Sequence, residues 1–281
     1  MVSPHFCYME LAFFQNQLAE FIILHIIAFC EGLMVVKGGV KVNYTRKLNH
    51  FFVFFLPFII KIYIPFTENL LTMILMVCIS MATFIIYLKP VRTKAKLFGV
   101  MYAAFDRPED RPHTMKWLFT QYLATYIVAV PLYFYFHHIG MAELLMLIIL
   151  VNAIGDGLAE PVGVTWGKHK YKVKALFTRQ TYTRSIEGSA CVFITAVLVL
   201  YGFNYLFTPM QFVAAMLFFP IGVTLAEAYS PHTWDSPLIF LVGGLILIAV
   251  INVDFEAIEE IYKNIEHTIH QVETQSTLLF E

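Results

Sequence analysis

In Val151-Asn-Ala-Ile-Gly-Asp-Gly-Leu-Ala-Glu-Pro-Val-Gly-Val-Thr-Trp-Gly-Lys-His-Lys170, an apolar segment gives way to carboxylates, glycines and lysines. The stretch spaces Asn152, Asp156 and Glu160 four residues apart, so on a helix their side chains share one face. Carboxylates at membrane depth are costly unless they are paired, hydrated or bound to a cation. The pattern therefore predicts a functional site on this helix face.

Composition places this stretch in a membrane protein. Hydrophobic residues make up 59% of the 281 residues and charged residues 14%, with a mean hydropathy of +0.69, far from the average of soluble domains. A net charge of -1 gives no reason to expect a nucleic-acid partner. The four cysteines occur singly, which argues against a zinc site.

Eight apolar stretches are long enough to cross a bilayer, at 12–36, 49–66, 69–88, 117–136, 141–160, 187–206, 209–228 and 237–253. The first contains several polar residues, so seven spans plus an interfacial segment is an open alternative. The sequence therefore predicts an all-α polytopic bundle of seven or eight helices over 1–253. An acidic, amphipathic tail is expected over 254–281.

Basic residues predict the orientation. All but two of the 19 Lys and Arg residues lie in three connections, at 37–47, 89–116 and 168–184. The positive-inside rule places these loops in the cytoplasm. With eight spans, the loop 227–237 and the polar motifs lie on the same side, and the tail lies on the other. We expect a multi-pass protein of a bacterial inner membrane or an ER- or plastid-type membrane.

Gly155 and Gly157 flank Asp156, and glycine lets backbone approach a ligand closely. Asp156, with Glu160 as a second candidate, would suit Mg²⁺, which needs only one or two protein carboxylates beside substrate phosphates. The competing interpretation is a buried aspartate that caps a helix or pairs with a lysine.

The basic connection after this stretch suits a triphosphate. Gly163 and Gly167 precede Lys168 and Lys170, but the spacing is not that of a Walker A motif. We expect a flexible basic loop whose lysines bind phosphate. The alternative is that these lysines only set the membrane orientation.

The next segment begins the sixth span. A helix that starts here directs its backbone N–H groups toward the cytoplasmic face and forms an anion site, to which Arg184, Ser185, Gly188 and Ser189 would contribute. The alternative is a helix cap followed by small packing residues.

Further candidates stand at the same predicted face. Glu227 ends the seventh span and Asp235 precedes the eighth, so either can serve the metal or act as a base at an acceptor hydroxyl. Arg46, Lys47 and His50 open the second span, where they can contact phosphate or substrate.

Together these motifs resemble the CTP-dependent polyprenol kinase family, which includes dolichol kinase, phytol kinase and the CTP-dependent diacylglycerol kinase. The resemblance covers about 45–240 and rests on Arg46-Lys-Leu-Asn-His50, Gly155-Asp-Gly-Leu-Ala159 with Gly163 and Gly167-Lys168, Arg184-Ser-Ile-Glu-Gly-Ser189, and Glu227 with Asp235-Ser-Pro237. It implies phosphoryl transfer from CTP to the hydroxyl of a membrane lipid such as phytol, a polyprenol or diacylglycerol. Asp156 stands where the family has its metal-site or nucleotide-site aspartate.

Three positions depart from the family's pattern. Arg184 stands where lysine is common, Ser236 where asparagine usually follows the aspartate, and Glu160-Pro161 is unusual after the alanine. The class of enzyme is unaffected, but the lipid acceptor and the oligomeric state stay open.

Two other functions remain as alternatives. Family members are related to phosphatidate cytidylyltransferases, which transfer CMP from CTP to phosphatidate, although the signature of that enzyme is absent. A transporter with an anion site at a helix broken by Pro161 belongs to a different class. No repeat between 49–136 and 141–253 supports it.

Overall fold

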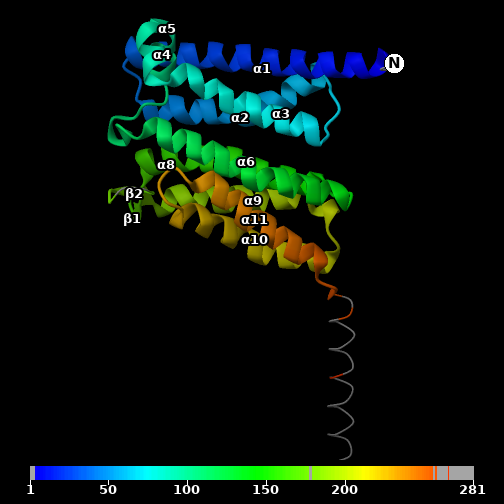
Figure 1. Cartoon of the computed structure of the whole chain (residues 1–281). Coiled ribbons are helices and arrows are strands. Elements are labelled where there is room, and N and C mark those ends of the chain that lie inside the picture. The colour runs from blue at the N-terminus through cyan, green and yellow to red at the C-terminus, as the bar shows by residue number, and fades with distance from the viewer. Residues whose placement is uncertain (1–3, 177–178, 256, 258–264, 266–281) are drawn as a thin grey trace, which may run out of the picture.

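A computed structural model describes residues 4–176, 179–255, 257 and 265, with side chains from Leu11 onward. Long antiparallel helices form a bundle, and one end of the bundle carries a small β-hairpin (Figure 1). The long elements are α1 (Pro4–Val36), α2 (Val42–Tyr63), α3 (Leu70–Thr83), α6 (Thr114–His138), α7 (Glu143–Leu150), α8 (Gly157–Trp166), α9 (Ile186–Gly202), α10 (Pro209–Tyr229) and α11 (Asp235–Asn252). Short helices in the connections are η1 (Phe84–Tyr87), α4 (Lys89–Lys94), α5 (Lys96–Ala103), η2 (Pro108–Asp110) and η4 (Asn204–Leu206).

The predicted all-α membrane bundle is confirmed at this level. Six helices or helix runs of the described chain are long and apolar enough to cross a membrane: Leu11–Val36, Leu70–Tyr87, Thr114–His138, Glu143–Trp166, Pro209–Tyr229 and Asp235–Asn252. The other two predicted stretches form α2, which carries more charge, and α9, which is shorter. The number of crossings and the side that faces the cytoplasm stay predictions.

Helix ends follow local chemistry. Asn69 and Thr208 each accept a hydrogen bond from a backbone N–H at the third helical position, and the side chain there bonds back, so both form capping boxes. Gly140 has φ +74 in the turn between α6 and α7, where a side chain would be strained. These signals fix where α3, α7 and α10 begin.

The main core lies among α6, α7, α9, α10 and α11. Fully buried side chains from all five of these helices interlock there, including Phe136, Ile148, Val192, Phe219 and Leu247. Glycines let the helices approach closely: a Cβ at Gly244 would lie 2.5 Å from the Leu132 side chain. These five packed helices form a rigid support for the residues at the hairpin end of the bundle.

The basic connection is a β-hairpin, so the expected flexible loop is wrong. Strand β1 (Lys170–Lys174) pairs antiparallel with β2 (Thr181–Ser185), and Tyr171 lies opposite Arg184. Val173 is buried while the neighbouring lysines are exposed, which is the alternation of a strand with one covered face. The hairpin positions Arg184 toward the helices.

The predicted stripe of three polar residues is also corrected. Residues Val151–Asp156 form a π-helix (η3) between α7 and α8. The fully buried Asn152 lines neither of the cavities described below. Asp156 and Glu160 remain near each other but bind different partners. Apart from 254, 255, 257 and 265, the predicted acidic tail lies outside the described residues.

Candidate functional site

Two cavities meet near the hairpin end of the bundle. A polar cavity of about 840 Å³ lies among α2, α8, the hairpin and the start of α11. An apolar cavity of about 350 Å³ lies between α1, α2, α3 and α6. Four side chains line both cavities, and we call them the junction: Arg46, Lys47, Asp156 and Asp235.

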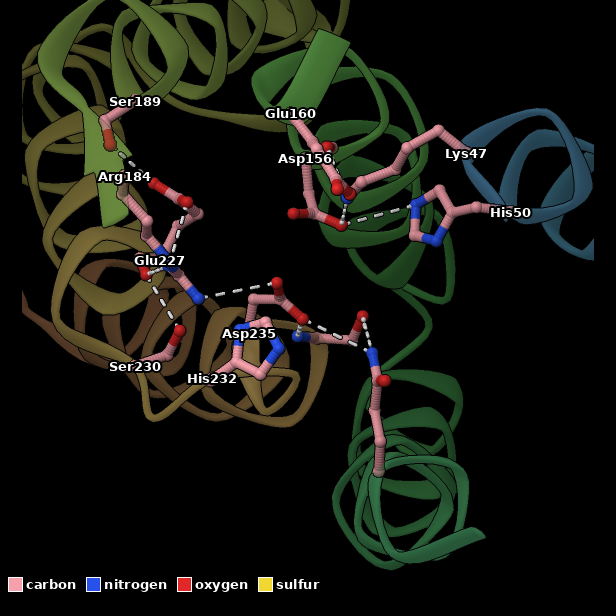
Figure 2. A network of polar contacts seen from close by, with 12 residues as sticks. Lys47, His50, Asp156, Glu160, Arg184, Ser189, Glu227, Ser230, His232 and Asp235 are labelled. Atoms are coloured by element: carbon pink, nitrogen blue, oxygen red, sulfur yellow. Dashed lines mark hydrogen bonds and ion pairs between the residues drawn. The ribbon is translucent and has the colours of Figure 1, made fainter. Parts of the chain in front are cut away.

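Asp156 is held by α2. Its Oδ2 lies 3.0 Å from Lys47 Nζ, which also donates to the Asp156 carbonyl oxygen at 2.9 Å. His50 Nε2 lies 3.1 Å from the Asn152 carbonyl oxygen and 3.6 Å from Asp156 Oδ2. Because these charges are buried, the pairing keeps an ionised Asp156 tolerable at this depth. Figure 2 shows its second carboxylate oxygen turned toward the open space opposite.

Arg184 faces Asp156 across that space (Figure 2). Its Nη1 lies 2.9 Å from Glu227 Oε1, and its Nη2 lies 3.6 Å from Asp235 Oδ2. Burial alone would lower the pKa of Arg184, but the Asp235 and Glu227 carboxylates outweigh burial and raise it. Ser189 Oγ donates to Glu227 Oε2 at 2.7 Å. These contacts join β2 to α9, α10 and the start of α11.

The α9 N-terminus, where the sequence predicts an anion site, lines the polar cavity. Ser185 is the N-cap residue, and its Oγ accepts from the Gly188 N–H at 3.1 Å. A Cβ at Gly188 would lie 2.6 Å from the Ala159 carbonyl oxygen, so glycine permits the close approach of α8 and α9. Gly163, Lys170, Ser185, Gly188 and Ser189 all line this cavity.

Several predicted residues lie outside the site. Gly155 and Gly157 serve helix packing, because a Cβ would lie 2.9 Å from Val192 Cα at the first and 2.8 Å from the Phe51 ring at the second. Gly167 packs on Ser185 in the same way. Lys168 is exposed and lines neither cavity. The idea that these glycines admit a ligand is therefore wrong.

Arg107 is the main site residue that the sequence analysis missed. Its guanidinium lies 2.8 Å from both Asp110 Oδ2 and Glu160 Oε1, and 2.9 Å from His232 Nε2. Burial alone would raise the pKa of Asp110, but the hydrogen bond with His232 and the Arg107 charge lower it from 3.8 to about 2. Glu160 also accepts from Asn43 Nδ2 at 2.7 Å. We call this set the Arg107 network.

Aromatic rings complete the network. The Tyr182 and His232 rings stack at a centroid distance of 3.4 Å, and Trp117 meets the His232 ring edge-on at 5.4 Å. The His232 backbone N–H donates to the Lys174 carbonyl oxygen at 3.0 Å. These contacts attach the hairpin to α6 and to the loop before α11.

The carboxylates allow a test of the predicted Mg²⁺ site. Among the described residues, no group of three or more His, Cys, Asp and Glu side chains could hold a metal ion. Mg²⁺ bound with substrate phosphates requires fewer ligands, and Asp156 has one oxygen outside its ion pair. Asp156 therefore fits such an ion, with Asp235 nearby. Glu160 fits it less well, because the same oxygen contacts both Arg107 and Asn43.

No family model matches this chain, and neither the curated proteins nor the solved structures contain a significant match.

The geometry can bring a charged molecule and an apolar molecule together. Arginines and lysines line the polar cavity beside a helix N-terminus, a combination that binds phosphate groups. Phenylalanines and other apolar side chains line most of the second cavity, which suits a hydrocarbon chain. Any contact between the two molecules would occur at the junction.

Proposed function

We propose that this protein transfers the γ-phosphate of CTP to the hydroxyl of a membrane lipid alcohol. The observation that carries the proposal is the junction, where the polar and apolar cavities share four charged side chains. A lipid kinase needs this arrangement because its two substrates come from water and from the bilayer. The identity of the nucleotide rests on the family resemblance of the motifs.

The polar cavity would hold the triphosphate. Lys47, Arg46 and Arg184 lie at or beside the junction, and Lys170 lines the same cavity. The α9 N-terminus adds oriented N–H groups near Ser185. Phosphoryl transfer depends mainly on positioning and on neutralising charge, and these groups supply both.

In the reaction, the bond between the γ-phosphorus and the β–γ bridging oxygen breaks, and a bond from that phosphorus to the lipid oxygen forms. CDP leaves, and the hydroxyl proton moves to a carboxylate. We assign this role to Asp235, which lines both cavities. Mg²⁺, when bound, supplies charge neutralisation on the phosphates. Asp156 would hold it, while Lys47 and His50 fix the orientation of Asp156.

The test is a kinase assay on purified protein. The assay combines γ-labelled CTP, Mg²⁺ and a panel of phytol, farnesol, undecaprenol and diacylglycerol, with Asp156→Asn beside the natural chain. We expect label in one lipid and a loss of about 100-fold or more in the variant, as for other preorganised electrostatic groups. Glu68→Gln, at the opposite end of the bundle beside Lys61, is the matched control and keeps activity.

Other outcomes identify the alternatives. Label from α-labelled CTP that enters phosphatidate would mean a cytidylyltransferase. If neither label reaches lipid with any acceptor, the kinase proposal fails and an anion transporter becomes the better candidate.

A further inference from the structure

The polar residues of α1 are not explained by phosphate transfer. They interrupt an otherwise apolar span, and the structure turns Gln17, Glu20 and His25 toward the apolar cavity. Polar and ionisable groups at membrane depth are costly, and they persist where they bind something. These residues therefore indicate a second polar region inside the apolar cavity.

The depth of this region follows from helix register. Asn16 Nδ2 donates to the Ile64 carbonyl oxygen at 2.9 Å, and α1 and α2 run antiparallel. With about 1.5 Å of rise per residue, His25 lies about 8 Å and Glu20 about 15 Å from His50 along the bundle. The polar region is thus separate from the junction. It would contact the part of a bound lipid that lies beyond the reacting hydroxyl, toward the other end of the bundle.

His25 offers a hydrogen-bond acceptor. Its Nδ1 lies 2.6 Å from the Phe21 carbonyl oxygen, which can only accept, so Nδ1 carries the proton. In the neutral ring Nε2 is then an acceptor, and it is buried without a partner among the described residues. The tilted Phe21 ring, at a centroid distance of 4.0 Å, and the stacked Tyr87 ring, at 6.0 Å, hold the His25 ring in place.

Glu20 offers acceptors of the same kind. Its Oε2 accepts from Gln17 Nε2 at 3.3 Å, and its Oε1 takes part in no hydrogen bond recorded for the described side chains. Across the cavity, Tyr126 donates its hydroxyl proton to Ser80 Oγ at 3.0 Å, which leaves the Tyr126 oxygen as a further acceptor. Buried acceptors normally have a hydrogen-bond donor as partner, so these acceptors indicate a ligand that carries donors.

We infer that the Glu20–His25 region binds a hydrogen-bond donor on the lipid, a hydroxyl or amide N–H beyond the hydroxyl that receives phosphate. This inference rests on the proposed function for the identity of the reacting hydroxyl. A plain isoprenoid tail has no polar group for these acceptors, and an ester carbonyl is itself an acceptor. A lipid with an amide or a second hydroxyl several bonds beyond the reacting hydroxyl matches them.

The experiment measures binding and transfer separately. The full chain in detergent receives a ceramide whose eight-carbon acyl chain ends in a hydroxyl (called ceramide below), dioctanoylglycerol or phytol, and thermal unfolding reports binding. We expect ceramide to raise the unfolding temperature more than the other two lipids. His25→Phe keeps the aromatic contacts but loses the acceptor, so it should remove the ceramide advantage and weaken ceramide binding about tenfold.

Three further variants control for folding. Glu20→Gln retains an acceptor oxygen and should keep the ceramide preference, whereas Glu20→Leu should lose it. Gln15→Leu, an exposed polar residue of α1 outside both cavities, should bind all three lipids as the natural chain does. Equal stabilisation by the three lipids, or a preference unchanged in His25→Phe, would overturn the inference.

The two proposals fail in distinguishable ways. If ceramide preference is present and is lost in His25→Phe while no lipid receives label from CTP, the kinase proposal is wrong and the binding region stands. If a lipid receives label but ceramide gives no advantage, the kinase proposal stands and the binding region is wrong.

Discussion

At the scale of single residues, the pairing of Lys47 with Asp156 dominates the junction. The Lys47 ammonium makes two contacts with one residue, and both side chains are almost fully buried. Desolvation opposes such a pair, but removing one partner leaves the other charge buried without compensation. The pair therefore maintains a carboxylate at a depth where isolated ones do not persist.

This pairing gives a prediction that does not depend on catalysis. Lys47→Met should lower the free energy of unfolding by about 3 kcal/mol, because Asp156 loses its buried partner. The double variant Lys47→Met with Asp156→Asn should cost less than the sum of the single changes, because no buried charge remains. Thermal or chemical unfolding in one detergent measures all three differences.

Lys61→Met is the matched control. Lys61 pairs with Glu68 near the opposite end of the bundle, where the two side chains are 37% and 30% exposed. A partly exposed pair contributes less than about 1 kcal/mol. Strictly additive losses at Lys47 and Asp156 would mean that their interaction stabilises nothing.

The sequence could identify Asp156, Arg184, Glu227 and Asp235, because carboxylates and arginines at span ends have few roles. It could not identify Arg107. The partners of that residue, Glu160 and His232, are 53 and 125 residues away in the chain, and only the fold brings them together.

At the scale of elements, the hairpin was missed although its signal is present. The run Lys-Tyr-Lys-Val-Lys at 170–174 alternates every two residues, as a half-buried strand does. The lysines alone suggested a solvated loop. The π-helix had no such signal, because Val151–Asp156 continues a helical stretch without any alternation of its own.

The Arg107 network connects these elements and predicts sensitivity to acid. Burial, helped by Arg107 and opposed by the Asp110 hydrogen bond, lowers the pKa of His232 from 6.5. Below pH 6.5, His232 binds a proton in the unfolded chain but not in the folded chain. The free energy of unfolding therefore decreases as the pH is lowered. Asp110 adds a loss of about 2 kcal/mol as the pH drops through 3.8 toward about 2. Unfolding temperatures measured across a pH series test this.

His232→Gln removes the titration but keeps a hydrogen-bonding side chain. In the pH range just below 6.5, the unfolding temperature of this variant should change less with pH than that of the natural chain. His138→Gln changes an exposed histidine at the other end of the bundle and should leave the dependence as it is. Equal slopes for the natural chain and His232→Gln would show that another group is responsible.

At the scale of the whole molecule, the sequence predicted the helices well. Each of the eight apolar stretches became a helix or a helix run, because apolar segments of this length have few other structures available in a membrane. The two cavities were beyond prediction. The walls of the apolar cavity come from α1, α2, α3 and α6, and those of the polar cavity from α2, α8, the hairpin and the start of α11. No periodicity along the chain reports which of these faces meet.

The membrane orientation is the remaining prediction at this scale. Figure 1 shows the hairpin at one end of the bundle and the start of α1 at the other. Because the basic connections gather with the hairpin, this end should face the cytoplasm, where CTP is available. Single cysteines at Lys172→Cys in β1 and His138→Cys at the end of α6 test both ends, in a chain whose own cysteines are replaced at Cys7, Cys30, Cys78 and Cys191. In intact cells an impermeant maleimide should label position 138 and spare position 172 until the membrane is opened. The reverse pattern would place the polar cavity outside the cell, where neither CTP nor the kinase reaction could be sustained.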